Sequence, residues 1–292
     1  MTSRGHAPSP ELAEMRRLMD ENAPAPDAEG VTVTELDADG VPVLKFTPEG
    51  ASPDLAILHF HGGGYRLGSP KGFSRYFARV AKALGATVYA PKYRLAPENP
   101  YPAALEDAVT VYQYLLAQGL PASGIIPGGD SAGGGLAAAL LLKIKELGLP
   151  SPGGAALFSA WADVRITSET FTSNAESDQL FPRERAEQAS SLFLQGADAS
   201  DPYASPVLGD WSGQPPLLIH VSNLETLLAD SLTIAEKASA AGVPVRLERF
   251  DGVQHVWHNA YPDTAESQRA VENWRDWLSS LGLTLAPSPL TV

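Results

Sequence analysis

The residues with the clearest capacity for chemistry lie at positions 125–142, in the stretch IIPGGDSAGGGLAAALLL. Ser131 stands there among glycines, with a short apolar run before it and a long Ala/Leu run after it. This pattern predicts a strand, a tight turn and a helix. The serine could attack an electrophile, the glycines could cradle a phosphate, or the turn could simply begin a helix.

Two phosphate-binding patterns fail in this stretch. A P-loop has a lysine and a hydroxyl directly after its glycines, whereas Ala137 and Ala138 follow here and the first lysine is Lys143. A dinucleotide-binding turn has an acidic residue at a strand end about 20 residues further on, and none stands there. The G-x-S-x-G pattern of residues 129–133 instead favours a nucleophile in a strained turn, whose close packing leaves no room for side chains beside it.

A nucleophilic serine also needs hydrogen-bond donors for the oxyanion that develops during attack. The run HFHGGGY, residues 59–65, follows a predicted strand and supplies backbone N–H groups at Gly63 and Gly64. The N–H of Ala132 is a third candidate donor. Alone, three glycines after a strand indicate only a loop, but together with the serine turn they favour an oxyanion hole.

A histidine beyond the last predicted strand is the candidate base. His255 and His258 both lie there, in the stretch FDGVQHVWHNA, and we expect His255 to act. A third ligand at a suitable spacing is lacking, so we expect no metal at this pair. His59 and His220 fall within predicted strands, where packing or hydrogen bonding is their expected role.

Four carboxylates are candidates for the acid that orients the base. Glu225 lies directly after the predicted strand 217–222 and is our choice. Asp230 is placed to interact with the N–H groups at the start of its own helix. Asp163 precedes a long irregular segment, and Asp251 is too close to His255 in sequence for a long-range clasp.

Alternating strands and helices must position these residues. The hairpin segments VTVTEL and VPVLKF are followed by a series of short apolar runs alternating with helical stretches. This rhythm predicts the α/β class, with a mostly parallel sheet, helices on both faces and functional groups at the carboxyl ends of the strands. The predicted strands are 55–61, 87–93, 124–129, 155–161, 217–222 and 244–250. The predicted helices include 10–22, 102–118, 132–147, 229–241 and 265–281, with one more after Pro182.

Composition excludes several classes of function. Lys and Arg number 21 against 34 Asp and Glu, and the net charge of -13 would repel nucleic acid. The chain has no cysteine, so disulfide and thiolate chemistry are ruled out. No stretch resembles a signal peptide or reaches the ~18 apolar residues of a membrane span. We therefore expect a soluble, cytoplasmic protein without a membrane or nucleic-acid partner.

Five stretches together resemble a known family. The set is HGGGY at 61–65, YRLAPENPYPAALEDA at 93–108, GGDSAGGGLA at 128–137, LETLLADS at 224–231 and HVWH at 255–258. In this order, over residues 55–280, they resemble the bacterial hormone-sensitive-lipase-like esterases, the family IV branch of the α/β-hydrolases. The resemblance implies a serine carboxylesterase that hydrolyses short-chain acyl esters through an acyl-enzyme intermediate, without a cofactor.

The resemblance also implies the roles of individual residues. The implied catalytic residues are Ser131 as nucleophile, His255 as base and Glu225 as acid. The implied oxyanion donors are the N–H groups of Gly63, Gly64 and Ala132. The side chains that we expect to contact the substrate are Tyr65, Leu18, Met19, Trp161, Leu180 and Trp257.

The family's architecture implies a domain organisation and a partner. We expect residues 1–30 to form a cap helix and its tether, and residues 31–292 to form the catalytic domain. The polar segment 162–200 is an excursion from the sheet that we expect to contribute to the lid. Family members often pair through the last strand, here 244–250, so a homodimer is expected beside the small-molecule ester.

Two departures and several alternatives stay open at this stage. Leu224 precedes Glu225 where the family commonly has Asp, which predicts fewer hydrogen bonds to the carboxylate. Pro127 falls in the strand before Ser131, where it removes a donor or marks the strand's end. The same residues could cleave a lactone, carbamate or amide, and the fold also serves ligand-binding receptors that have lost a catalytic residue.

Overall fold

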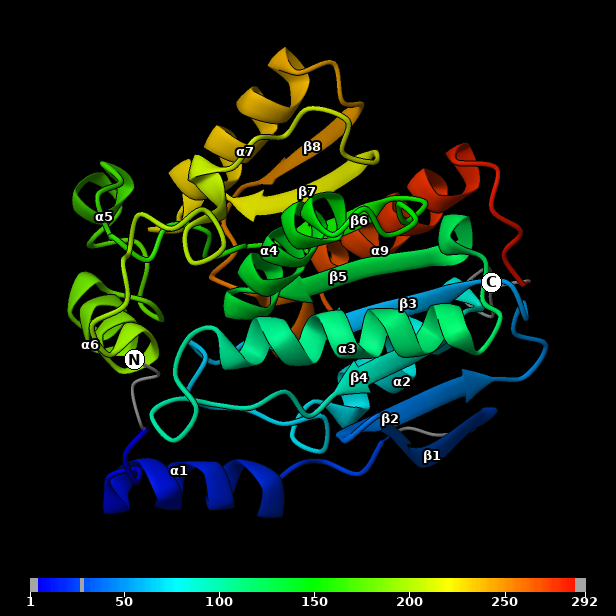
Figure 1. The fold of residues 1–292 in the computed structure, drawn as a ribbon, viewed down its shortest axis with the longest axis horizontal. Coiled ribbons are helices and arrows are strands. Elements are labelled where there is room, and N and C mark those ends of the chain that lie inside the picture. The colour runs from blue at the N-terminus through cyan, green and yellow to red at the C-terminus, as the bar shows by residue number, and fades with distance from the viewer. Residues whose placement is uncertain (1–4, 27–28, 287–292) are drawn as a thin grey trace.

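An eight-stranded sheet forms the centre of the molecule (Figure 1). The computed structural model describes residues 5–26 and 29–286. The sheet order is β1-β2-β4-β3-β5-β6-β7-β8, with β1 and β2 antiparallel to their neighbours and the remaining pairs parallel. The strands are β1 (Val31–Ala38), β2 (Val41–Pro48), β3 (Ala56–Phe60), β4 (Thr87–Pro91), β5 (Ile125–Asp130), β6 (Ala155–Phe158), β7 (Leu217–Ser222) and β8 (Val245–Phe250).

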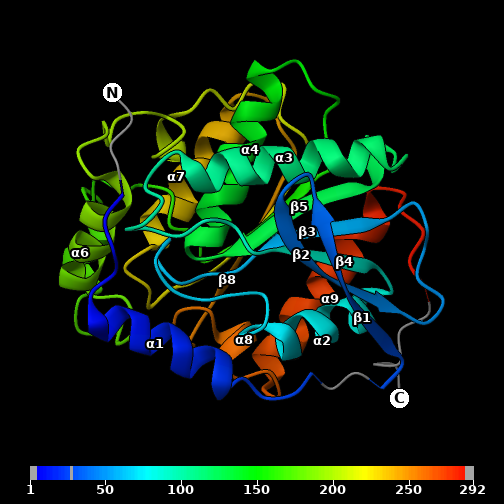
Figure 2. The same ribbon diagram turned by 60° about the horizontal axis from the view of Figure 1, so that its bottom comes forward.

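Helices cover both faces of this sheet, as Figures 1 and 2 show. One face carries α3 (Ala103–Ala117), α4 (Ala132–Glu146) and α7 (Leu228–Ala240), and the other carries α2 (Ser74–Leu84) and α9 (Ala265–Ser280). Neighbouring residues of β3 serve different cores: Leu58 packs with the first group of helices and Ile57 with the second, because side chains alternate along a strand. The predicted α/β class, with a mostly parallel sheet between two helical layers, is confirmed.

The central strand β5 and the adjacent strand β6 each differ from the expectation drawn from the sequence. Pro127 lies inside β5, paired with Leu58 of β3, and does not mark the strand's end. The strand tolerates it because β6 pairs with β5 only from Gly128 onward, so residue 127 has a neighbour on one side. β6 is shorter than predicted because Ser159 adopts a φ of 47° and turns the chain out of the sheet.

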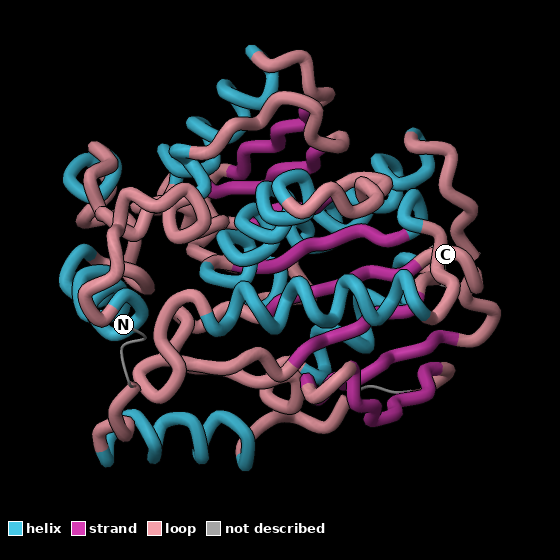
Figure 3. The backbone as a smooth tube through the Cα atoms, viewed as in Figure 1, coloured by secondary structure: helices cyan, strands magenta, loops and turns pink. Residues whose placement is uncertain are grey.

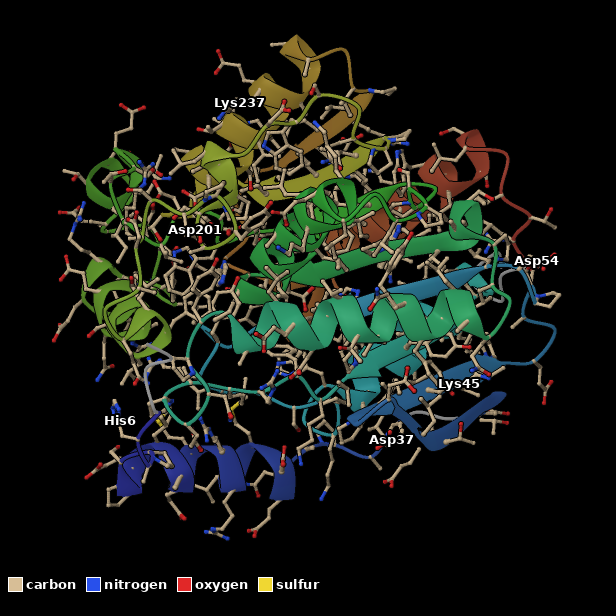
Figure 4. The ribbon with its side chains drawn as sticks, viewed as in Figure 1. His6, Asp37, Lys45, Asp54, Asp201 and Lys237 are labelled. Carbon is tan, nitrogen blue, oxygen red and sulfur yellow. The ribbon has the colours of Figure 1, made fainter. Side chains whose placement is uncertain are left out.

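The chain between β6 and β7 lies beyond the carboxyl edge of the sheet and is largely loop, as Figure 3 shows. The helix predicted after Pro182 is present as α6 (Arg183–Leu194), and a four-residue helix, α5 (Thr170–Ser173), precedes it. The loop after α6 is fastened to the body by Asp201, labelled in Figure 4, which accepts a hydrogen bond of 2.8 Å from the hydroxyl of Tyr101.

The N-terminal helix α1 (Pro10–Glu21) lies beside α6 at this same edge (Figure 2). It is fastened to the body through Arg16. The guanidinium of Arg16 donates to the carbonyls of Arg66 and Ala96 at 2.8 and 2.6 Å and pairs with Glu98 at 2.5 Å. One side chain of α1 therefore holds three points on the body.

The described residues bear on two other expectations. None of the helices in residues 5–26 and 29–286 combines the length and hydropathy needed to cross a lipid bilayer. The expected division into residues 1–30 and residues 31–292 stays a prediction. It includes positions 1–4, 27–28 and 287–292, which lie outside the described residues.

Arg16 provides a test of how α1 is held. In Arg16→Gln, we expect amide hydrogen exchange within residues 10–21 to accelerate about tenfold or more, because hydrogen bonds to charged groups are each worth about 1.5–3 kcal/mol. The control is Arg17→Gln, since Arg17 is half-exposed and, among the described residues, pairs with Glu14 and Glu21 of its own helix. Equal acceleration in both variants would show that Arg16 does not fasten the helix.

Candidate active site

Ser131 occupies the turn between β5 and α4. Its backbone has φ 53° and ψ -122°, a left-handed conformation that is strained for any residue with a side chain. The turn is held by hydrogen bonds of 2.9 Å from the Ser131 N–H to the carbonyl of Phe158 and from the Trp161 N–H to the carbonyl of Ser131. The serine therefore stands at the carboxyl end of the central strand, as the sequence predicts.

The glycines beside Ser131 allow this turn to pack directly on the end of β3. A Cβ added to Gly133 would lie 2.0 Å from the carbonyl oxygen of Phe60, and one added to Gly129 would lie 2.4 Å from Gly133. Real Cβ atoms do not approach backbone so closely, so both positions exclude any larger residue.

His255 and Glu225 complete a hydrogen-bonded chain with the serine. His255 Nε2 lies 2.9 Å from Ser131 Oγ, and its Nδ1 lies 2.8 Å from Glu225 Oε2. Glu225 follows β7 and His255 follows β8, and these adjacent parallel strands deliver both loops to one edge of the sheet. All three side chains are buried. The structure thus brings together the three residues that the sequence suggests.

The carboxylate of Glu225 is better supported than expected. Besides His255, it accepts hydrogen bonds of 2.7 Å from the Ser159 hydroxyl and 2.8 Å from the Ser222 N–H. The expectation that Leu224 leaves it with fewer hydrogen bonds is wrong, because these donors lie directly after β6, at Ser159, and at the end of β7, at Ser222, rather than at position 224. Sequence reasoning missed Ser159, because it falls inside the predicted strand 155–161 and nothing in the sequence sets it apart.

The excursion between β6 and β7 holds the Glu225 loop from the other side. Asn174 donates to the carbonyl of Glu225 at 2.8 Å. The buried carboxylate of Asp178 accepts from the N–H and hydroxyl of Thr226 at 2.9 and 3.0 Å. Polar residues in this segment thus hold the loop that carries Glu225 in place.

The surroundings of His255 shift its pKa upward. Burial by itself lowers the pKa of His255, but the charge of Glu225 and its hydrogen bond outweigh burial and raise the pKa above its ordinary value. Phe181 stacks on the imidazole at a centroid distance of 5.8 Å and covers one face of the ring. The ring is therefore both oriented and shielded.

Asp230 has a structural environment that differs from the expected one. It lies in the first turn of α7, but its carboxylate accepts 2.9 Å hydrogen bonds from the N–H groups of Ala162 and Asp163 rather than from its own helix. Burial raises the pKa of Asp230 to about 8. Asp163 pairs with Arg165. Neither carboxylate contacts His255, which leaves Glu225 as its partner.

The glycine-rich run after β3 faces the serine. Gly63 and Gly64 have φ angles of 120° and 62°, which turn the chain back over the end of β5. Within the described part of the chain, no hydrogen bond uses the N–H of Gly63, Gly64 or Ala132 as its donor. Ala132 begins α4, and the first N–H groups of a helix lack partners within it. These donors are available to an anionic oxygen.

A cavity of about 470 Å³ opens over Ser131 and His255. Its walls include Leu180, as predicted, together with Met15 of α1 and Phe181. Leu18 and Met19 do not line it and are about 40% exposed, at 41% and 36%. Helix α1 therefore contributes Met15 to the cavity wall, rather than Leu18 and Met19.

Three aromatic residues expected at the substrate belong to the surrounding core instead. Tyr65 stacks on Phe193 with a centroid distance of 4.0 Å. Trp161 packs behind Phe181, and Trp257 packs on Phe250 beneath the end of the sheet. Tyr65, Trp161 and Trp257 shape the site from outside the cavity lining.

His258 serves a different partner from His255. Its Nε2 lies 2.8 Å from the buried carboxylate of Asp130, which also contacts His59 Nε2 at 3.3 Å. Burial alone would raise the pKa of Asp130, but the charge of His59 and the hydrogen bond from His258 hold it well below its usual range. Sequence reasoning missed this cluster, which supports the strand end directly before Ser131.

The fold and this arrangement define a hydrolase of the α/β type. A family model described as the alpha/beta hydrolase fold matches residues 57–259, so the chain belongs to that family.

Solved structures and relatives place it more closely. It is 37% identical to EstE5 soaked with p-nitrophenyl butyrate, with a TM-score of 0.88 and coverage of 96% of this chain and 94% of that one. An esterase from the bacterial hormone-sensitive lipase family is 36% identical, with a TM-score of 0.84 and coverage of 94% and 99%. An acetyl-hydrolase of Streptomyces hygroscopicus is 40% identical over 216 residues, 74% of this chain and 72% of that protein. The chain is a carboxylesterase of the hormone-sensitive-lipase-like branch.

The packing of the serine turn yields a stability prediction. Gly133→Ala should lower the free energy of unfolding by about 3 kcal/mol or more, at the upper end of overpacking effects, because its Cβ would meet backbone that cannot yield. The control is Gly72→Ala, where the nearest atom would lie at an ordinary 3.5 Å. Denaturant unfolding measures both, and similar midpoints would contradict the close packing.

Proposed function

We propose that this carboxylesterase hydrolyses short-chain acyl esters with Ser131 as nucleophile, His255 as general base and Glu225 as the acid that orients the base. The observation that carries the proposal is the unbroken hydrogen-bonded chain from Ser131 Oγ through His255 to Glu225, with distances of 2.9 and 2.8 Å. Such a chain raises the nucleophilicity of a serine hydroxyl.

The reaction proceeds in two halves. His255 Nε2 takes the proton of Ser131 as Oγ bonds to the ester carbonyl carbon, while Nδ1–H donates to Glu225. The tetrahedral intermediate collapses, the carbon–alkoxy bond breaks, and the proton passes from His255 to the leaving alcohol. A water molecule then attacks the acyl-enzyme, giving its proton to His255, and the acid product leaves as the proton returns to Ser131.

In this proposal the oxyanion and the acyl group of the substrate bind to different parts of the site. The N–H groups of Gly63, Gly64 and Ala132 bind the oxyanion, supported by their lack of partners within the described residues. The preference for short acyl groups rests on the size of the cavity, about 470 Å³, which also has to hold the alcohol portion. A neighbouring structure, EstE5, is described as soaked with p-nitrophenyl butyrate, an ester whose acyl group has four carbons.

Other acyl bonds are the second candidate. Lactone, carbamate and amide cleavage would use the same side chains, and the name acetyl-hydrolase of the Streptomyces relative leaves the bond type open. A ligand-binding receptor is disfavoured because Ser131, His255 and Glu225 are all present. A panel of matched ester, lactone and amide substrates distinguishes these alternatives.

The cap and the dimer remain parts of the proposal. Residues 1–30 act as a cap through α1, since Met15 lines the cavity and Arg16 holds the helix in place. Homodimers form through β8, which stands at the end of the strand order with β7 as its neighbour. Sedimentation of the protein and of a variant with charged substitutions along β8 tests this assembly.

Ser131 should be the site of covalent inactivation. Phenylmethylsulfonyl fluoride should sulfonylate Ser131 and abolish ester hydrolysis, and Ser131→Ala should lower kcat on the order of 10⁶-fold. Peptide mass spectrometry locates the adduct, with the buried Ser159 as the internal comparison. Hydrolysis that persists in Ser131→Ala would end the proposed mechanism.

Glu225 and Asp230 can be separated by matched amide variants. Glu225→Gln should lower kcat by up to about 10⁴-fold. It also removes the charge that raises the pKa of His255 and leaves the burial that lowers it. Because the base acts when neutral, activity falls as pH falls through this pKa. The acid limb of the kcat/KM profile should therefore move to lower pH.

The matched control is Asp230→Asn. Its carboxyl group, with a pKa of about 8, is largely protonated at pH 7, and an amide oxygen can accept the same two backbone hydrogen bonds. We expect little change in kcat or in the position of the acid limb. If Asp230→Asn lowered kcat more than Glu225→Gln, with both variants folded, then Glu225 would be the wrong choice for the acid.

A further inference from the structure

Two arginines line the cavity over Ser131. Arg66 follows the glycine-rich run and is half-buried, and Arg185 of α6 stands at the rim. Both belong to a chain with 21 Lys and Arg against 34 Asp and Glu. The chain as a whole is negatively charged, yet two positive side chains line this one cavity. We therefore ask what function these two arginines have there.

Neither arginine has a carboxylate partner. Across residues 5–26 and 29–286, the Arg66 guanidinium makes no hydrogen bond or ion pair, and Arg185 donates only to the carbonyl of Leu180, at 3.2 Å. Arg16 and Arg165, which are also partly buried, pair with Glu98 and Asp163, and the partly buried Arg275 donates to the carbonyls of Ala83 and Ala286. Arg66 thus lacks the kind of partner that holds these other partly buried arginines.

The electrostatic state of Arg66 is unfavourable without an anion. Burial, and then the charge of Arg185, lower the pKa of Arg66, which means that the two cations act on each other. The acidic residue in the cavity wall is Asp130, whose carboxylate is already engaged by His258 and His59. A partly desolvated cation with a like charge nearby is costly, and a bound anion would remove that cost.

We propose that the preferred substrate of this enzyme is an ester that carries a carboxylate, which Arg66 and Arg185 bind while the ester carbonyl lies at Ser131. The planar guanidinium matches a carboxylate with two parallel hydrogen bonds. The inference rests on the proposed function, since it concerns the cavity in which Ser131 is the nucleophile. It adds a substrate class, an anionic ester, to the short acyl chain.

Matched ester pairs test the proposal on both sides of the scissile bond. On the alcohol side, 4-acetoxybenzoate is compared with its methyl ester. On the acyl side, monoethyl adipate is compared with ethyl hexanoate. The measured quantity is the ratio of kcat/KM for the charged ester over the neutral one. We expect a ratio of about 10 or more for at least one pair, because hydrogen bonds to charged groups are worth about 1.5–3 kcal/mol. The ratio should fall as salt is added.

The variants show whether the two arginines cause the preference. In Arg66→Gln/Arg185→Gln, the ratio should fall to about one; using the ratio within one protein cancels any general loss of activity. The control is Arg75→Gln, which removes one arginine charge from an exposed position on α2 that does not line the cavity. Its ratio should equal that of the unaltered enzyme.

Two outcomes overturn the inference and leave the proposed function intact. One is hydrolysis of both neutral esters with no preference for either charged partner. The other is a preference that the double variant retains. The proposed function fails separately, if none of the four esters is hydrolysed and phenylmethylsulfonyl fluoride leaves Ser131 unmodified.

Discussion

The backbone contact between the serine turn and the end of β3 is the constraint on which the rest of the site depends. Gly133 packs so closely on the carbonyl of Phe60 that a single Cβ would lie 2.0 Å from it. This contact fixes the ends of two central strands at one point. The glycine-rich run after β3 and the first N–H of α4 then converge on the same place, and the loops after β7 and β8 have only to reach it from the neighbouring side of the sheet.

Carboxylates at this edge of the sheet are stabilised largely by hydrogen bonds rather than by lysine or arginine. Glu225 is held by Ser159, Ser222 and His255, and Asp178 by Thr226 and backbone N–H groups. Burying a charge is costly unless its hydrogen bonds are satisfied. The segment between β6 and β7 supplies many of these contacts, so it has a structural role as well as a place over the cavity.

The sequence predicts those parts of the molecule that local pattern determines. Strand and helix alternation, the glycines around Ser131 and the place of His255 after the last strand all follow from residue order. The support of Glu225 by Ser159 and the orientation of Asp230 toward Ala162 could not be predicted, because they depend on tertiary packing between segments about 70 residues apart. Leu18 and Met19 lie outside the cavity for the same reason: helical spacing identifies an apolar face but not the surface that this face meets.

The hydrogen bond from Arg16 to the carbonyl of Arg66 has a consequence for exchanging parts between related enzymes. The N-terminal helix holds the backbone of Arg66, a residue that lines the cavity. A chimera that receives this helix from a relative lacking an equivalent arginine would lose a backbone anchor of Arg66, even if every apolar contact were retained. The helix and the charge in the cavity are therefore best treated as one transferable unit in protein engineering.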